Sequence, residues 1–463
     1  MKWQSYLRCA LFTTINIILY AISFGHYTWL EGRIQRNKFS NWAKRFKYRP
    51  PHIAFPTTEA DIVELVKNSK KIRVVGSGHS FNAGVISDET LISLDKYCGL
   101  IDQDLAQKQM TFRAGTRVRD VTKILLTHGL AFAALPSHDA QSLAGILSTD
   151  VHGTGNKWGF VSETAVKLKI IDGTGAVHEC TPTEDLYKAA IGGVGAVGII
   201  TEVTIQAVDR FHVEQKFWLD DLAAIEANLD DLLQKNDHIS LYVFPFTNKC
   251  QVNSWNVTKA SKSFLGDLRE FVAISLDAFV AGWFGNFLAY AGLLPKLSSL
   301  GYGLKKGANL VLESNKAFNR SIYHLHQELE FAIPYEDSVV TWRRFIQLYE
   351  SLYAEGLPYL LFEVRFTPAG HNRTLIGAGR ERKSTWIDLV CNDSFGYKTY
   401  YRAAEKMMKE IGARPHLGKY CQQLNHDILA QCHQEKFAHF CQLRAAHDPE
   451  GKFINSFTEQ LFA

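Results

Sequence analysis

The sequence lacks the features that identify several common classes of protein. Its eight cysteines include no pair with CxxC spacing, which argues against a structural zinc site. Their scatter along the 463 residues fits a reducing compartment better than a disulfide framework. His433 and His439 lack the i, i+4 spacing of metal ligands on a helix, and no metal site is predicted. The formal net charge is only +4, so nucleic-acid binding is not indicated.

A Rossmann-type dinucleotide fingerprint is also absent, although its letters occur. Gly193, Gly195 and Gly198 form the pattern GxGxxG. In the Rossmann fold this motif follows a strand and opens a helix. Here it follows a predicted helix over 184–191 and opens a predicted strand over 199–207. The reversed order excludes NAD binding at these glycines.

The chain begins with a long hydrophobic run. Residues 9–30 are mostly apolar, and a helix needs roughly 20 such residues to span a bilayer. Seven basic residues follow between positions 33 and 49, whereas only Lys2 and Arg8 precede the run. The positive-inside rule therefore predicts a membrane anchor with the catalytic body in the cytoplasm. A cleaved signal peptide, with a poor cleavage site at 21–23, and a buried N-terminal helix are the alternatives.

The first distinctive motif of the globular part is the turn 75–80, with the sequence Val-Gly-Ser-Gly-His-Ser. Thr57, Thr58 and Asp61 predict a helix start before it, and residues 72–75 predict a short strand leading into it. Glycines let backbone N–H groups approach a ligand closely, and successive N–H groups form a nest for phosphate oxygens. His79 adds a possible nucleophile. The motif suggests a nucleotide cofactor that is held here and attached covalently; a Gly-rich hairpin with a surface histidine is the alternative.

A second run of small residues extends from Ser142 to Gly155 and ends in His-Gly-Thr-Gly. Its composition lets backbone and hydroxyl groups line a long polar ligand. A predicted hairpin, with strands at 167–172 and 177–180, follows it. The order of these motifs with Gly-Ala-Val-Gly-Ile-Ile-Thr-Glu-Val-Thr at 195–204 resembles the FAD domain of vanillyl-alcohol-oxidase-type flavoproteins. Within that group the chain resembles the sugar-lactone and alditol oxidases, such as gulonolactone, arabinonolactone and alditol oxidases.

The resemblance implies an α+β fold with a two-lobed FAD-binding domain and an α+β cap domain that binds substrate. The N-terminal hydrophobic helix would be added to this core as an anchor. The expected divisions are 1–46 for anchor and basic linker, 47–209 for the FAD-binding domain, 210–414 for the cap, and 415–463 for a segment returning to the flavin.

The resemblance also implies that FAD is bound covalently, with the flavin 8α-methyl carbon attached to His79. Ile199 and Ile200 would lie near the adenine end of the cofactor. The full set of expected cofactor-binding residues is Val75, Gly76, Ser77, Gly78, His79, Ser80, Ser142, Gly145, Ser148, Thr149, His152, Gly153, Ile199 and Ile200.

Two further segments carry the candidate catalytic residues. Residues 361–367 alternate as a strand, so Glu363 and Arg365 point to the same face. By composition alone this is more often a surface ion pair, but a matching Glu-x-Arg faces the flavin in the sugar oxidases. Residues 414–420 resemble a family segment with Lys419 in place. Leu417 stands where relatives commonly have tryptophan, which leaves the packing around Lys419 and the substrate preference open.

With these residues in place, the resemblance implies hydride transfer from a sugar lactone or polyol to flavin N5. Glu363 would accept the hydroxyl proton, Arg365 would orient the substrate oxygen, and Lys419 would stabilise negative charge near flavin N1. The electron acceptor is oxygen, a quinone or a cytochrome. A membrane-tethered scaffold that keeps the flavin fold without turnover is the alternative, and the presence of all three residues disfavours it. Glu330 borders the expected pocket without an assigned role.

Residues 264–300 form a second apolar segment. Between 271 and 300 only Asp277 and Lys296 are charged, and aromatic residues are crowded together. A buried pair of cap helices is one interpretation. A surface that dips into the membrane beside the N-terminal anchor is another, and a quinone-access site is a third.

Overall fold

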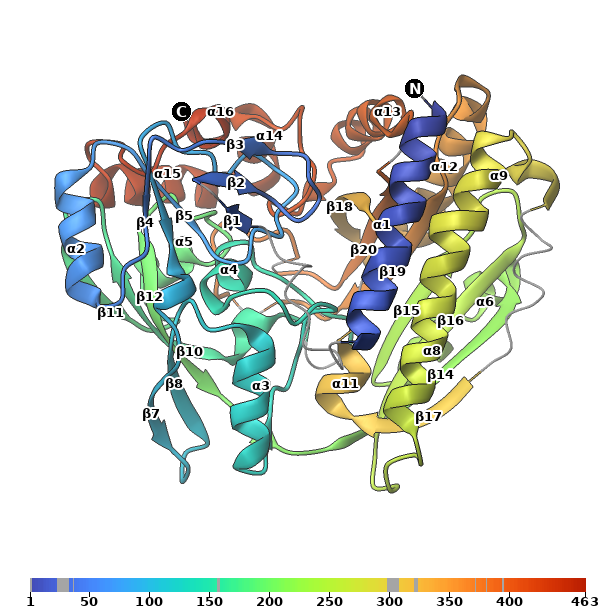
Figure 1. The fold of residues 1–463 in the computed structure, drawn as a ribbon, viewed down its shortest axis with the longest axis horizontal. Helices are drawn as coiled ribbons and strands as arrows, with labels where there is room; N and C mark the ends of the chain where they lie inside the picture. Colours follow the sequence, from blue (N-terminus) through green and yellow to red (C-terminus); the bar gives the residue numbers. More distant parts are fainter. Residues whose placement is uncertain are drawn as a thin grey trace.

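The computed structural model describes residues 2–22, 33–35, 37–155, 159–297, 308–319, 324–370, 372–379, 381–393 and 395–463. The chain forms two lobes that lie side by side (Figure 1). Strands β4 to β12 and the C-terminal helices build one lobe, and the large sheet with strands β14 to β20 builds the other. This mixed arrangement agrees with the expected α+β fold.

The first lobe begins with a small parallel sheet. Its order is β4 (His52–Ala54), β6 (Thr90–Ser93) and β5 (Ile72–Val75). Helix α2 (Glu59–Asn68) connects β4 to β5, and it starts as predicted. The Thr58 hydroxyl accepts a hydrogen bond from the Asp61 N–H, and the Asp61 carboxylate accepts one from the Thr58 N–H. This capping box satisfies N–H groups that the first helical turn leaves open.

A five-stranded antiparallel sheet completes this lobe. The predicted hairpin is present, because Leu168 pairs with Cys180 and Ile171 with Val177. Three helices, α3 (Val118–Thr127), α4 (Leu143–Ser148) and α5 (Asp185–Ala190), contribute buried residues to the same core. The strands are β7 (Leu100–Asp104), β8 (Gln109–Arg113), β10 (Ala165–Ile171), β11 (Val177–Cys180) and β12 (Ile199–Gln206).

The second lobe is built on an eight-stranded antiparallel sheet in the order β17-β14-β16-β15-β19-β20-β18-β21. Helices α12 (Ser338–Leu352) and α13 (Tyr397–Glu410) bury aromatic side chains against it. The strands are β14 (His212–Asp221), β15 (His238–Val243), β16 (Lys249–Thr258), β17 (Ala308–Glu313), β18 (His326–Pro334), β19 (Leu360–Thr367), β20 (Ser384–Asn392) and β21 (Arg414–Pro415).

A break divides the helical stretch after β14 into two short helices. These are α6 (Leu222–Ala227) and α7 (Leu229–Lys235). The Asn228 side chain donates to the Ala224 carbonyl at 2.8 Å. Asparagine competes with the backbone for hydrogen bonds in this way, which explains the break.

The C-terminal helices return to the first lobe. They are α14 (His426–His433), α15 (Glu435–His447) and α16 (Ser456–Phe462). Phe440 and Leu461 are buried in the core of the five-stranded sheet. The Lys452 carbonyl accepts a hydrogen bond from the Ile72 N–H at 2.7 Å, at the start of the strand that leads into the glycine turn. The two ends of the globular chain are therefore built into one lobe.

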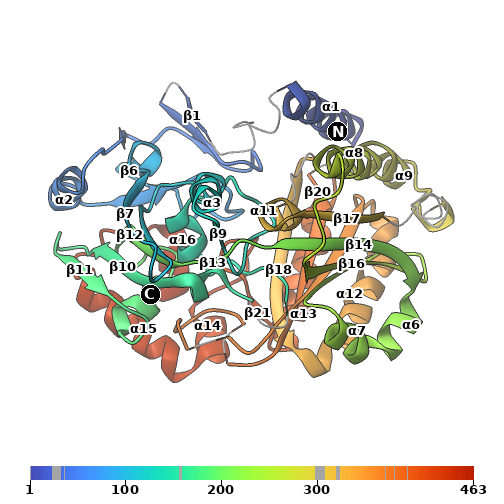
Figure 2. The same ribbon diagram turned by 90° about the horizontal axis from the view of Figure 1, so that it is seen from below.

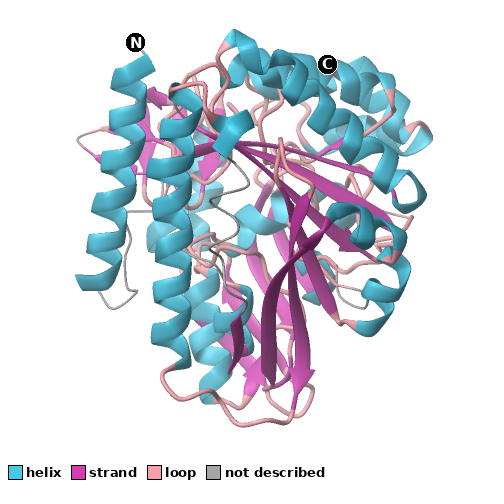
Figure 3. Cartoon of the chain, turned by 90° about the vertical axis from the view of Figure 1, so that its right-hand side faces the viewer, coloured by secondary structure: helices cyan, strands magenta, loops and turns pink. Residues whose placement is uncertain are grey.

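The N-terminal helix α1 (Lys2–Ile22) begins earlier than the predicted anchor 9–30, and residues 23–30 of that segment lie outside the described residues. It lies beside α8 (Gly266–Phe279) and α9 (Asn286–Tyr290) (Figure 3). The π-helical turn Val280–Gly285 connects α8 to α9. Among the described residues, one helical stretch is long and apolar enough to cross a membrane by length and composition alone, and it is Gly266–Tyr290. Only 28% of its apolar window is buried, so this segment is not the buried helix pair considered above.

Candidate functional site

The turn after β5 lies against the start of α4. A Cβ atom added to Gly76 would lie 1.9 Å from the Ser142 hydroxyl oxygen, so a larger residue here would displace the Ser142 side chain. Gly78 has a φ of +66°, which glycine adopts without strain. The Ser142 hydroxyl also accepts a hydrogen bond from the Gly145 N–H at 3.3 Å. The two glycine-rich runs of the sequence are thus held against each other.

A large cavity follows these loops between the two lobes. It encloses about 1500 Å³, including the part open to solvent. All but two of the predicted cofactor-binding residues line it. Ser142 lies behind Gly76, and Gly153 lines a neighbouring cavity. The predicted residues along the large cavity are Val75, Gly76, Ser77, Gly78, His79, Ser80, Gly145, Ser148, Thr149, His152, Ile199 and Ile200.

His79 sits on this cavity in an aromatic setting. Its ring stacks on Trp42 at 5.8 Å between centroids and lies 4.4 Å from the ring of His138. Burial lowers the pKa of His79 well below its ordinary value, with the neighbouring His138 adding to the effect. The imidazole is therefore neutral. Its buried Nε2 has no hydrogen-bond partner among the residues that the structure describes.

Five ionisable side chains gather at the other wall of the cavity, and four of them line it, while Asp388 lies within 3.6 Å of both cations. Glu328 and Glu330 lie on β18, Asp388 on β20 and Arg365 on β19, while Lys419 follows β21. Arg365 and Lys419 form ion pairs with these carboxylates. Arg365 contacts Glu330 and lies 3.6 Å from Asp388. Lys419 contacts Glu328 and lies 3.6 Å from Glu330 and 3.4 Å from Asp388.

The protonation states of these groups balance the positive and negative charges of the cluster. Burial opposes ionisation of Glu330, but Arg365 and Lys419 outweigh it and hold the pKa of that carboxyl well below its usual range. Burial raises the pKa of Asp388 well above its usual range. The pKa values of Arg365 and Lys419 are raised, because the carboxylates more than offset the burial of these cations. Two cations therefore face two carboxylates and one neutral carboxyl group.

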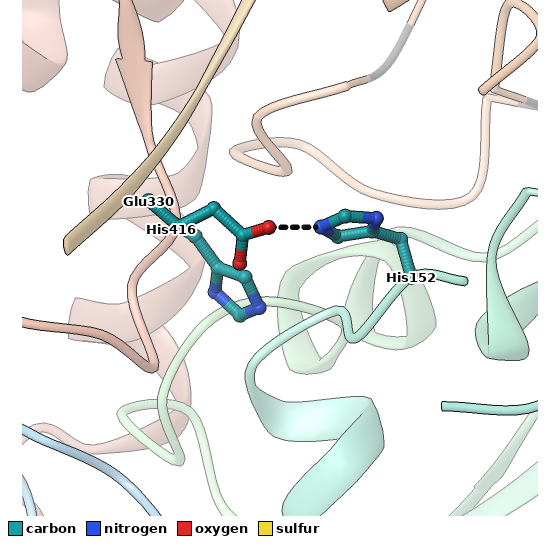
Figure 4. Close-up of side chains that lie close together, drawn as sticks. All are labelled: His152, Glu330 and His416. Carbon is teal, nitrogen blue, oxygen red and sulfur yellow. Dashed lines mark hydrogen bonds and ion pairs between the residues drawn. The ribbon is translucent and has the colours of Figure 1, made fainter. Parts of the chain in front are cut away.

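Glu330 is at the centre of the site and also faces two histidines (Figure 4). Its Oε1 lies 3.1 Å from His152 Nε2. Burial lowers the pKa of His152, and it lowers that of His416 to about 3. The three residues are close enough to hold a metal ion. Arg365 and Lys419 already neutralise Glu330, however, and would repel a cation, so the donor set does not fit a metal.

Glu363 occupies a neighbouring cavity. Arg365 and Ser137 line both cavities, whereas Glu363 lines only the smaller one, together with His238, Ser240, Trp255 and Phe318. The Ser240 hydroxyl donates to the Glu363 carboxylate at 3.1 Å. The structure therefore brings Arg365 and Lys419 together around Glu330. Glu363 lies in the smaller cavity, which Arg365 also lines.

The sequence motifs assigned no role to four residues of this site, which are Glu328, Glu330, Asp388 and His416. The alternation of Glu328 and Glu330 on one strand was a usable signal, since both point to one face. Asp388 offered none, because its place opposite Glu330 and Glu363 depends on strand pairing.

Comparisons with known proteins agree with this architecture. Residues 203–461 match the family described as D-arabinono-1,4-lactone oxidase, and residues 50–181 match the FAD binding domain family. L-gulonolactone oxidase of Bos taurus is 27% identical over 450 residues, which cover 92% of this chain and 98% of that protein. L-gulono-1,4-lactone dehydrogenase of Mycobacterium tuberculosis is 26% identical over 438 residues, covering 91% and 98%.

Solved structures support the same fold. Cholesterol oxidase from Brevibacterium sterolicum superimposes with a TM-score of 0.74 at 16% sequence identity, covering 93% of this chain and 98% of that one. This likeness concerns the fold alone. It confirms the expected two-lobed FAD-binding architecture with its second α+β domain.

Proposed function

The chain belongs to the D-arabinono-1,4-lactone oxidase family, and from this premise we propose that it oxidises a hydroxyl group of a sugar lactone or polyol. It is an FAD-dependent oxidoreductase that acts on CH–OH donors. The observation that carries the substrate proposal is the buried wall of Arg365, Lys419 and Glu330 beside the large cavity. Fixed charges in a dry site bind hydroxyl and carbonyl oxygens strongly.

The residues around the glycine turn fit FAD. Gly76 and Gly78 keep the backbone open to phosphate oxygens. The neutral His79 has a buried Nε2 at the cavity that forms no hydrogen bond with any described residue. We propose that this nitrogen is bonded to the 8α-methyl carbon of the flavin. The remaining predicted residues along the cavity would contact the rest of the cofactor. FAD, when bound, supplies the acceptor for the hydride that the substrate loses.

The chain's own groups bind the substrate and move its proton. Arg365, which lines both cavities, would hold the reacting oxygen. Glu363 would accept the hydroxyl proton, directly or through water, while its hydrogen bond from Ser240 keeps it oriented. Lys419 would place positive charge where negative charge develops. Glu330 would position both cations, because it contacts Arg365 and lies 3.6 Å from Lys419.

We propose that the final electron acceptor of the reaction is oxygen or a membrane electron carrier such as a quinone or a cytochrome.

We place the protein at a membrane, attached through the hydrophobic N-terminal segment that was predicted at 9–30, with the catalytic body on the cytoplasmic side. Support comes from the apolar helical surface next to α1 and from the basic residues between 33 and 49.

Anaerobic flavin bleaching tests the proposed activity. The purified protein is mixed with a panel of aldonolactones and alditols, and loss of the visible flavin absorbance is followed. Glu363→Gln should keep the flavin but slow its reduction by about 100-fold or more, since one proton acceptor is worth roughly that factor. Glu355→Gln, at an exposed position, is the matched control. Bleaching by no substrate, with flavin fully bound, would favour the non-catalytic scaffold.

A further inference from the structure

Helix α1 and the helical stretch Gly266–Tyr290 present apolar residues to solvent. Fourteen of the twenty-one large hydrophobic residues that are exposed in the described structure come from α1 or from 264–290. We propose that this surface, called here the docking face, binds an anionic phospholipid bilayer with both helices lying flat in the membrane interface. Its exposed members are Trp3, Leu11, Ile15, Ile18, Ile22, Phe264, Leu265, Leu268, Val272, Leu276, Phe279, Phe284, Phe287 and Tyr290.

Helix α1 has its polar and apolar sides reversed relative to a helix on a water-soluble protein. Leu11, Ile15, Ile18 and Ile22 recur at helical spacing and are all exposed, and Ile22 retains 69% of its accessible surface. The opposite side is buried in the protein and carries the polar residues Thr13 and Asn16, which are completely buried. Exposure of this apolar side to water is unfavourable, and its transfer into an apolar phase lowers the free energy.

Helices α8 and α9 continue the same surface. Leu268, Val272, Leu276 and Phe279 form one exposed stripe along α8, and Phe287 extends it on α9. Asp277 is also exposed, but it is five residues from Val272 and so projects roughly 140° away from it around the helix. Asp267 and Arg269 are exposed in the first turn of α8, and beyond that turn the stripe is uncharged.

The contact between the two helices resembles packing inside a membrane. A Cβ atom on Gly282 would lie 2.4 Å from the Thr13 hydroxyl oxygen, so this glycine allows the helices to approach closely. The Trp283 indole N–H donates to the Thr14 hydroxyl at 3.0 Å. Small residues and interhelical hydrogen bonds hold helices together where the surroundings are as apolar as the side chains. The helices thus keep their polar groups between them and their apolar groups outside.

Basic residues near the docking face favour an anionic bilayer as the binding partner. Strands β1 (Arg33–Gln35), β2 (Lys38–Ser40) and β3 (Lys47–Tyr48) follow α1 in the chain, and Figure 2 shows β1 on the same side of the molecule as α1 and α8. Lys38 and Lys47 are exposed on this small sheet. Basic residues beside an apolar face add electrostatic attraction to anionic lipids, roughly 1 kcal/mol each.

The structure favours a flat orientation over a spanning one. Helix α1 is held against the body through two adjacent residues of its second turn. Arg8 forms an ion pair with Asp393, and the Cys9 thiol donates to the Leu325 carbonyl at 3.6 Å. A spanning helix would have to break these contacts and the Thr14–Trp283 hydrogen bond. Interfacial helices bury one apolar side and keep the other side on protein or water.

Vesicle flotation tests the docking face. The full-length flavoprotein is mixed with phosphatidylcholine vesicles that contain or lack phosphatidylglycerol. We expect flotation with the anionic vesicles, and a partition coefficient lowered about tenfold by Val272→Asp, since a charge in the interface is costly. Val340→Asp is the matched control, because Val340 is also an exposed helical valine, 66% accessible, and lies on α12 outside the docking face. An unchanged partition coefficient for Val272→Asp, or no flotation at all, would overturn the proposal.

A protease-cleavable tag ahead of Met1 distinguishes the flat orientation from the spanning one. In sealed inverted membrane vesicles, the flat orientation leaves the tag on the same side as the catalytic body, so added protease removes it without detergent. Cleavage only after detergent would show a spanning helix and reject the flat orientation. Flavin content and bleaching by substrate are measured on the same variants. Loss of flotation with normal bleaching separates this inference from the proposed activity.

Discussion

The backbone N–H of Phe81 donates a hydrogen bond to the carbonyl oxygen of Gly418 at 2.9 Å. The Asn82 side chain adds a second link, because its amide donates to the Leu417 carbonyl. These bonds tie the loop that carries His79 to the loop that carries Lys419. The distance between the proposed flavin attachment point and the buried lysine is therefore fixed by hydrogen bonds within the chain.

His79→Ala should abolish acid-stable flavin. The proposed bond needs the neutral imidazole, and alanine has no nucleophile to replace it. After acid precipitation the wild-type pellet should be yellow, whereas flavin from the variant should remain in the supernatant. His128→Ala, at an exposed histidine, serves as the control. A yellow pellet from His79→Ala would disprove the assignment of the linkage.

Gly76→Ala should prevent cofactor loading, because its Cβ atom would lie 1.9 Å from the Ser142 hydroxyl oxygen. Ser142→Gly alone should cost only a few tenths of a kcal/mol, since glycine is a tolerated N-cap residue. The double variant should regain part of the flavin content by removing the clash. The flavin-to-protein absorbance ratio measures all three. Equal loss in the single Gly76→Ala and the double variant would show that the clash is not the cause.

Lys419→Met should lower both stability and turnover. It leaves Glu328 and Glu330 buried with Arg365 as the remaining cation of the cluster, and breaking a buried pair costs about 3–5 kcal/mol. Urea denaturation would measure the change. Lys235→Met removes an exposed partner of Asp231 at 2.7 Å and should change stability by less than about 1 kcal/mol. Similar costs for the two variants would contradict the proposed role of the buried cluster.

Asp150→Asn should stabilise the protein at neutral pH. Burial raises the pKa of Asp150 from 3.8 to about 7. The folded protein keeps a proton that the unfolded chain releases above its own pKa, so wild-type stability falls as pH rises between these values. At roughly 1.4 kcal/mol per unit the difference reaches up to about 4 kcal/mol. Asparagine also suits the positive φ of +48° at this position.

Urea denaturation of wild type and Asp150→Asn at a series of pH values provides the check. The two curves should converge below pH 4, where the carboxyl group is protonated in both states, and separate towards pH 7. The Ser162 hydroxyl donates to Asp150 at 2.8 Å and can still donate to the amide oxygen. A difference in stability that is independent of pH would show that titration of Asp150 does not cause it.

Local sequence was sufficient where neighbouring residues determine the structure. The strand Ile72–Val75, the capped start of α2 and the hairpin β10–β11 were predictable, because alternation, caps and turn glycines act over a few residues. The reversed GxGxxG was recognisable for the same reason. The family motifs also indicated the fold and the cofactor class, which the comparisons confirm.

Only the tertiary structure decided which charges meet. Glu330, Asp388 and Lys419 come together because strand pairing places β18 next to β20 and the chain returns beside them after β21. Such pairing depends on contacts between distant segments, which local patterns do not record. The same holds for α1, whose sequence predicted a hydrophobic segment but could not show which side packs on the protein. Burial of Thr13 and exposure of Ile15 follow from the position of α8, and that position is a property of the folded chain.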